Sequence, residues 1–429
     1  MQRDFKADPR GCGLARIGTR FLAALVLLVA MAPVQALPRS APPQDPTYLT
    51  ILGQPEEFAK EFPVAPPASS RQIGFGIVLY TLNTAAAELR RQTEEALDKA
   101  ERTGYPVLIH MDDWNFPAAS QDPAMAEWSA FPRPGEKRGP VIRRRWINWG
   151  SWIVAGAPPN TESPAFRADM RLRVRSVADP VAGRLKRWRA EGKAHLLAGL
   201  VVGWESGYYT MDDFRPGERP RAGAEVLGDD EIGRAGYAAL TARRQSAATV
   251  RKLAARTRRS EPEVIHDLMV GVVHDYTAFL CGVCRAAGVP RERIYTHYTG
   301  IGALAPDAVP GPLRADGRNM PLRAAVNGAS RPGITATLPW TDVPRAAAAF
   351  RAERRREWGA VEIEFTDVTR GEEPALKFLE SLSGSGARVM CIYGWWEAPE
   401  HTFGVRGSGA VPAMKRWLSG GPDPNRPNR

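Results

Sequence analysis

Short apolar runs alternate with segments of helical periodicity along most of this chain, and the alternation constrains the fold more than any other feature. Residues 73–80 are apolar almost throughout, as expected of a strand buried on both faces, and residues 84–103 follow with helical periodicity and alternating charge. The same order recurs toward the C-terminus. The strand-like runs are residues 73–80, 106–112, 145–149, 197–204, 293–298, 333–338, 361–365 and 389–393.

Eight strands, most of them followed by a helix, predict an α/β protein built as a (β/α)₈ TIM barrel with long strand-end loops. The run at residues 145–149 is the weakest of the eight. Without it, the competing prediction is an open, doubly wound sheet.

The two ends of the chain differ from its middle. Residues 1–36 combine basic residues with an apolar run at 21–31 that is shorter than the ~20 residues of a membrane span, which predicts a signal peptide and a secreted or periplasmic protein. An uncleaved anchor is the alternative, and no later segment of the mature chain predicts an integral membrane segment. Residues 37–70 are expected to be a Pro-rich linker and lead-in, residues 71–418 the barrel, and residues 419–429 a disordered tail.

The formal net charge is +11, but the basic residues are not gathered into a patch. Residues 351–356, for example, place arginines beside Glu and Ala on a predicted helix, so we expect solvated helix faces and no nucleic-acid partner. Cys281 and Cys284 have the spacing of a redox dithiol but lie inside a helical pattern, which favours core packing or an incidental disulfide over redox chemistry. The sequence has no phosphate-binding loop, dinucleotide fingerprint or serine-nucleophile elbow, so no cofactor is predicted.

Two carboxylates close apolar strand-like runs: Glu205 after residues 200–204, and Glu364 within residues 360–365. A carboxylate at the end of a buried strand needs a partner or a function, because burying an unpaired charge costs free energy. Catalytic side chains also gather at the C-terminal strand ends of barrels. The pair is therefore a candidate acid/base pair. The alternative is that each glutamate pairs with an arginine.

In the strand count above, Glu205 follows the fourth strand and Glu364 lies in the seventh. In this placement the chain resembles the clan A glycoside hydrolases, a (β/α)₈ superfamily. The resemblance implies a retaining mechanism on a glycosidic, β-linked substrate, with Glu205 as acid/base and Glu364 as nucleophile, and it implies that Trp395 and Trp396 after the eighth strand form an aromatic platform under the sugar. Trp204 is a departure, because the superfamily usually has Asn before the acid/base glutamate.

Other polar and aromatic residues near the predicted strand ends are candidate sugar contacts. Asn148 is a candidate for the hydroxyl contact that Trp204 cannot make, and Glu362 is a rival to Glu364 because it shares its face of the strand under period-two alternation. The remaining candidates are Asp112, Asp113, Trp114, Trp149, Tyr208, His297 and Tyr298. Many of the aromatic residues would equally serve as core.

Two further functions stay open from the sequence. One is a carbohydrate-binding barrel without catalysis. The other is a metal-dependent hydrolase with His110, Asp112 and His297 as ligands, although these residues lack a tight ligand motif and a fourth ligand. A buried histidine with satisfied hydrogen bonds is the simpler interpretation of His110.

Overall fold

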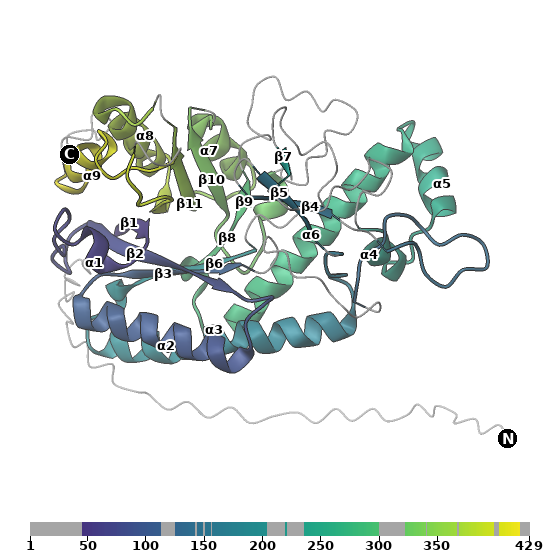
Figure 1. The fold of residues 1–429 in the computed structure, drawn as a ribbon, viewed down its shortest axis with the longest axis horizontal. Coiled ribbons are helices and arrows are strands. Elements are labelled where there is room, and N and C mark those ends of the chain that lie inside the picture. The colour runs from purple at the N-terminus through teal and green to yellow at the C-terminus, as the bar shows by residue number, and fades with distance from the viewer. Residues whose placement is uncertain are drawn as a thin grey trace, which may run out of the picture. The chain divides into compact units, whose positions relative to one another are not determined.

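A computed structural model describes the part of the chain that forms the fold (Figure 1). The described residues are 45–112, 125–141, 144–148, 151–155, 157–203, 219–220, 236–299, 322–339, 341–366, 369–398 and 403–420. The predicted signal peptide at 1–36 lies outside these residues, as do residues 421–429 of the predicted tail.

The main sheet is a parallel barrel. Its strands are β1 (Thr47–Leu52), β2 (Arg71–Tyr80), β3 (Val107–Asp112), β6 (Leu197–Val202), β8 (Ile294–Thr296), β9 (Tyr298–Thr299), β10 (Gly333–Leu338), β11 (Trp358–Phe365) and β12 (Ala387–Ile392). Each pairs in parallel with its neighbours in the order β8-β6-β3-β2-β1-β12-β11-β10-β9. Only His297 separates β8 from β9, so the two ends of the sheet meet, and the described strands form the nearly closed (β/α)₈ barrel that the sequence predicts.

The strand count was wrong in two places, and the two errors cancel. Strand β1 lies within residues 37–70, which we expected to be linker and lead-in, and it pairs with β2 and β12 as the first barrel strand. The run at residues 145–149 is instead β4 (Arg144–Asn148), which pairs antiparallel with β5 (Ser151–Ala155) in a separate small sheet that also holds β7 (Arg219–Pro220). A hairpin needs only a short turn, whereas parallel pairing needs a long crossover, and β5 follows β4 too closely for a crossover. Strand β6 is thus still the fourth strand and β11 still the seventh.

Helices follow most of the barrel strands. They are α1 (Pro55–Phe58), α2 (Ala86–Thr103), α3 (Pro164–Ala190), α4 (Tyr237–Ala242), α5 (Ala247–Thr257), α6 (Glu261–Ala286), α7 (Val343–Ala352), α8 (Glu372–Gly384) and α9 (Ala410–Leu418), with 3₁₀ turns η1 (Ala194–Leu196), η4 (Arg291–Arg293) and η5 (Leu322–Ala325). Figure 1 shows α2 and α3 side by side along β2 and β3. Ser163 caps α3 and Ser260 caps α6, each accepting a bond from a backbone N–H three residues on.

Helix α6 is long and apolar enough to cross a membrane by length and composition alone, and it is the one such helix among the described residues. It packs against α3, α5 and β8 in the fold, and 56% of its most apolar window is buried. The side chains of Cys281 and Cys284 are buried on this helix, which agrees with core packing.

Buried side chains form two separate cores, one between barrel and helices and one inside the barrel. The inner core contains Tyr48, Leu108, Ala198, Val201, Tyr295, Val361, Val389 and Cys391. The Tyr295 ring fits because Gly199 and Gly359 face it, and a Cβ atom at either glycine would lie 2.8 Å from a ring carbon. The Tyr295 hydroxyl accepts a 3.1 Å bond from buried Arg331, so a cationic group lies beside this mainly apolar inner core.

Candidate functional site

Polar side chains replace apolar ones inside the barrel as the strands approach their C-terminal ends. The residues concerned are His110 and Asp112 on β3, His297 between β8 and β9, Thr335 and Thr337 on β10, and Glu362 and Glu364 on β11, and all are buried. The C-terminal strand ends are where (β/α)₈ barrels hold their active sites. This polar cluster is therefore the candidate site.

A bulge in β11 sets the orientation of its two glutamates. Ile334 is paired with Ala360, but the next residue, Thr335, is paired with Glu362, so Val361 is an extra residue in β11. Val361 belongs to the inner core, and Ile363 packs in the outer core. Glu362 and Glu364, on either side of Ile363, therefore both face the barrel interior.

The two glutamates lie at different depths and have different neighbours. Glu364 Oε2 accepts a 2.7 Å hydrogen bond from Thr337 Oγ1. Glu362 lies two residues nearer the N-terminal end, with its Oε2 3.4 Å from His297 Nε2. The same His297 nitrogen is 2.8 Å from Thr335 Oγ1, so His297 and Thr335 form the layer beneath Glu364.

Two buried histidines lie close together inside the barrel, with the rings of His110 and His297 6.3 Å apart and edge to face. Burial lowers the pKa of His110 to about 3. Burial also lowers the pKa of His297 well below its ordinary value, and the nearby His110 adds to the effect. Both rings are thus neutral at pH 7, and His297 provides Glu362 with a dipole instead of a compensating positive charge.

Asp112 marks the rim of the site, at the last position of β3. It is paired in register with Tyr80 on β2, and its backbone carbonyl accepts bonds from the N–H and the hydroxyl of Thr81. Burial raises the pKa of the Tyr80 phenol, and the charge of Asp112 raises it further. A carboxylate and a phenol therefore lie together at this edge of the barrel mouth.

Two of the predicted sugar contacts point away from the barrel interior. The Tyr298 hydroxyl lies 2.9 Å from Thr277 Oγ1 on α6, because Tyr298 follows inward-facing His297 and so faces outward. Trp395 is 5% exposed; its indole N–H donates to the Glu57 carbonyl, and its ring packs edge to face against Phe58 at 6.3 Å. The contact roles that we predicted for Tyr298 and Trp395 are corrected to packing roles.

Trp396 differs from its neighbour in sequence. It is 41% exposed and lies edge to face with Tyr393, with ring centroids 5.2 Å apart, just beyond the C-terminal end of β12. The exposed Trp396 ring, beside the partly buried Tyr393 ring, offers an apolar surface at this strand end. Of the two residues of the predicted platform, Trp396 alone stays a candidate, with Tyr393 as a neighbour that the sequence did not single out.

Several predicted residues lie outside the described part of the chain. These are Glu205, Asp113, Trp114, Trp149 and Tyr208. For Asn148 the backbone alone is described, and it pairs with Ser151 at the end of the β4–β5 hairpin.

The alternative metal site does not form from its three predicted ligands. His110, Asp112 and His297 are all described, and no group of three or more His, Cys, Asp or Glu among the described residues is arranged to hold a metal ion.

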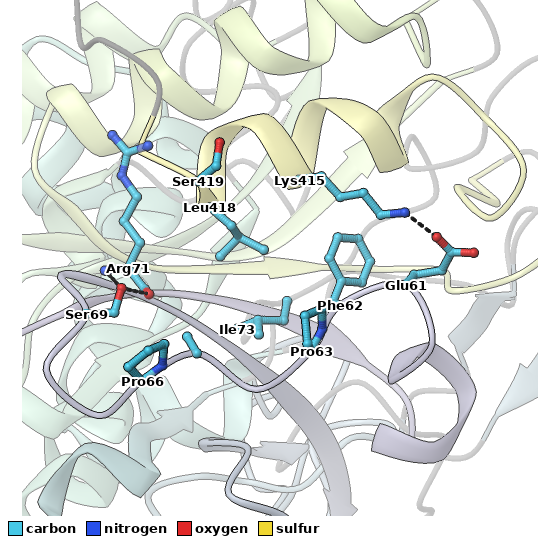
Figure 2. A pocket seen from close by; sticks show the side chains of 11 residues that line it. Glu61, Phe62, Pro63, Pro66, Ser69, Arg71, Ile73, Lys415, Leu418 and Ser419 are labelled. Carbon is cyan, nitrogen blue, oxygen red and sulfur yellow. Dashed lines mark hydrogen bonds and ion pairs between the residues drawn. The ribbon is translucent and has the colours of Figure 1, made fainter.

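A cavity of about 350 Å³ lies at the other end of the barrel, near the start of β2 and the end of α9 (Figure 2). Phe62, Ile73 and Leu418 supply most of its apolar wall, and Lys415 pairs with Glu61 at its edge. It is remote from the polar cluster at the C-terminal strand ends. We therefore place the candidate site by the side chains at the strand ends and not by this cavity.

Thr335 and Thr337 are site residues that the sequence reasoning missed. Their signal is present, because residues 333–338 carry threonines at alternate positions of an otherwise apolar strand. Alternation places both on one face, and a row of hydroxyls on a fully buried strand indicates hydrogen-bonding partners on the next strand.

Comparisons with known proteins give fold likeness only. No model of a protein family matches the chain. No curated protein matches it either. One solved structure that matches is an endo-β-1,4-mannanase from Cellulomonas fimi, with 12% sequence identity and a TM-score of 0.39 over 87% of this chain and 70% of that one. A xylanase A catalytic core matches with 10% identity and a TM-score of 0.39 over 87% of this chain and 98% of that one. An endoglucanase from Clostridum cellulovorans matches with 11% identity and a TM-score of 0.35 over 87% of this chain and 94% of that one. These TM-scores are below 0.5, so the likeness does not indicate the function of this chain.

Proposed function

We propose that this protein is a glycoside hydrolase with a retaining mechanism, in which Glu364 is the nucleophile and Glu205 the acid/base. The observation that carries the proposal is the inward-facing Glu364 near the C-terminal end of the seventh barrel strand, hydrogen-bonded by Thr337. Glu205 follows the fourth strand, β6, by three residues. The fourth and seventh strands are on opposite sides of an eight-stranded barrel, so carboxyl groups at their ends can flank one bond of a substrate.

The chemistry assigns a different task to each carboxyl group. A retaining enzyme needs two carboxyl groups about 5–5.5 Å apart: one attacks the anomeric carbon as a carboxylate, and the other first protonates the leaving oxygen and then activates water. The hydroxyl of Thr337 stabilises the charged form of Glu364, as the nucleophile requires. Glu364 is the better nucleophile candidate than Glu362, because Glu362 lies one layer deeper beside His297.

The site also supports binding of a sugar. Asp112 and Tyr80 supply polar groups at the rim, and Trp396 with Tyr393 supplies an exposed aromatic surface at the end of β12. Sugars are commonly held by such a combination, since ring C–H groups pack on aromatic faces while carboxylates accept bonds from hydroxyls. We include export to the periplasm or outside the cell in the proposal, on the basis of residues 1–36.

Turnover of aryl β-glycosides and β-linked polysaccharides by the purified mature protein tests the proposal. Glu205→Gln and Glu364→Gln should each lower kcat by about 10²-fold or more, as expected for loss of an acid/base or nucleophilic group, while sugar affinity stays close to that of the wild type. Glu397→Gln is a matched control, because Glu397 is a partly exposed carboxylate near β12 that pairs with Arg406.

Three results would separate the alternatives. Sugar binding without any turnover by the wild type would favour a carbohydrate-binding barrel. Activity that is lost on exhaustive chelation and restored by a divalent metal would favour a metal-dependent hydrolase. An exported protein whose N-terminus begins at residue 1 would contradict the cleaved signal peptide.

A further inference from the structure

Arginines gather at the N-terminal end of the barrel, opposite the candidate site. Arg291 lies in η4 just before β8, Arg331 lies two residues before β10, and Arg355 lies three residues before β11. Strands β10 and β11 are parallel neighbours, and Arg331 also forms a parallel bridge with Tyr295 of β8. The three arginines are far apart in sequence, so no local run of basic residues marks them. We call Arg291, Arg331 and Arg355 the arginine cluster.

The side chains of the cluster are attached to one short segment of backbone. Arg291 Nε donates to the Ser330 carbonyl at 3.3 Å, and Arg355 Nη2 donates to the Asn327 carbonyl at 2.9 Å. Both carbonyls belong to the segment that ends in Arg331, so the three side chains share one scaffold. A guanidinium group has five N–H donors, and most of those on Arg291 and Arg355 remain available for another acceptor.

The carboxylates near the cluster do not neutralise it. Glu357 pairs with Arg331, and the same carboxylate also pairs with Arg388 at 2.7 Å. In the part of the chain that the structure describes, no carboxylate lies within ion-pair distance of Arg291 or Arg355, whose hydrogen bonds go to backbone carbonyls. The cluster therefore carries an excess of positive charge.

The positive charges of the cluster act on one another. Burial lowers the pKa of Arg291, and the charges of Arg355 and Arg331 lower it further. Glu292 opposes this effect only in part, and Arg285 adds to the lowering. A lowered arginine pKa means that the surroundings disfavour positive charge, and such surroundings favour a bound anion.

A purely structural role would not require this arrangement. Arg167 shows the more favourable form: its Nε donates to the Thr161 carbonyl at 2.7 Å, and its Nη2 pairs with Glu162 at 2.8 Å. By contrast, the Arg355 Nε and the Ser330 hydroxyl are buried and have no hydrogen-bond partner among the described residues. A buried polar group without a partner is costly, and a bound ion is one ordinary way to satisfy it.

We propose that the arginine cluster binds a tetrahedral oxyanion of the phosphate type, at a site separate from the candidate site at the C-terminal strand ends. Guanidinium groups suit this ligand, because their paired N–H groups match two oxygens of a phosphate. Inorganic phosphate and a phosphate ester share this chemistry. The inference does not depend on the proposed function, because the cluster lies at the opposite end of the barrel.

Calorimetric titration of the purified protein with inorganic phosphate tests the site. Ionic strength is held constant with chloride, so that general screening does not change during the titration. Wild type should bind phosphate saturably. Arg291→Gln and Arg355→Gln should each weaken binding by about tenfold or more, because each variant loses donors of charge-assisted hydrogen bonds.

Arg167→Gln is the matched control. It also loses a side chain that anchors a backbone carbonyl, but one that already has Glu162 as its partner, so phosphate affinity should equal that of the wild type. Urea unfolding of each variant identifies conditions under which all are folded. A second titration with phenyl phosphate distinguishes the two sources: tighter binding of the ester assigns the site to a phosphorylated ligand, and tighter binding of inorganic phosphate assigns it to the free ion.

The outcomes separate this inference from the proposed function. The absence of saturable binding of either compound by folded wild type would overturn the site. Equal affinity in wild type and in both cluster variants would overturn it too, as would an equal loss in Arg167→Gln. A protein that binds phosphate through the cluster but has no glycosidase activity would contradict the proposed function alone.

Discussion

The Thr337 hydroxyl, on β10, donates a 2.7 Å hydrogen bond to Oε2 of Glu364 on β11. Both side chains are buried, and they face each other because Thr337 and Glu364 are paired in register between parallel strands. A hydrogen bond to a buried carboxylate favours its charged form. Thr337 therefore orients the Glu364 carboxyl group and favours its charged form.

Thr337→Val should lower kcat about tenfold or more, because a hydrogen bond to a charged group contributes about 1.5–3 kcal/mol. Steady-state kinetics on an aryl glycoside measures the change. Thr277→Val is the control: Thr277 is also buried, but its hydroxyl lies beside Tyr298 outside the barrel, so kcat per folded molecule should not change. Equal losses in the two variants would show that the effect of Thr337 is structural.

Acid should destabilise the fold through His110. Burial lowers its pKa from 6.5 to about 3, so between these values the unfolded chain binds a proton that the folded protein does not. Stability should fall as the pH drops from about 6.5 toward 3, with a contribution of up to about 1.4 kcal/mol per pH unit from this group. Urea unfolding at pH 7, 6, 5 and 4 measures the slope, and His110→Gln should flatten it. The same slope in wild type and variant would contradict the prediction.

Gly359→Ala should destabilise the protein by about 1–3 kcal/mol through overpacking, because the new Cβ would lie 2.8 Å from the buried Tyr295 ring. Urea unfolding again gives the free energy. Gly282→Ala is the control, since a Cβ at Gly282 on α6 meets nothing within 4 Å, and it should be neutral or stabilising by up to about 1 kcal/mol. A neutral Gly359→Ala would mean that the inner core can shift to admit a methyl group.

Substitution of the two adjacent tryptophans should affect different properties: KM in the case of Trp396 and stability in the case of Trp395. Trp396→Ala should raise KM several-fold with little loss of stability, because an exposed ring contributes stacking on a ligand, about 0.5–1.5 kcal/mol. Trp395→Ala should cost about 3–5 kcal/mol of stability through loss of packing on Phe58 and Phe62. Kinetics and urea unfolding of both variants test the contrast, and an unchanged KM in Trp396→Ala would remove Trp396 from the site.

The sequence by itself determined the fold class, since buried parallel strands are apolar runs and their crossovers are periodic helices, and both are local patterns. It also located Glu364 on the seventh strand. That number is right only because two errors in the strand count offset each other: β1 was missed, and β4 was counted as a barrel strand. Strand β1 was missed because it lies in a segment rich in proline, and only its pairing with β2 and β12 gives it a place in the barrel. Which chain segments pair is a long-range property that local pattern does not contain.

Tertiary structure alone decided which side chains meet. The bulge at Val361 points Glu362 and Glu364 inward, the register of β10 brings Thr337 to Glu364, and the chain direction after β12 buries Trp395 while leaving Trp396 exposed. The physical reason is that hydrogen-bond geometry and burial depend on the partner strand and on neighbouring helices, which are distant in sequence. The sequence predicted a barrel and two candidate carboxylates, whereas packing determined which side chains lie next to Glu364.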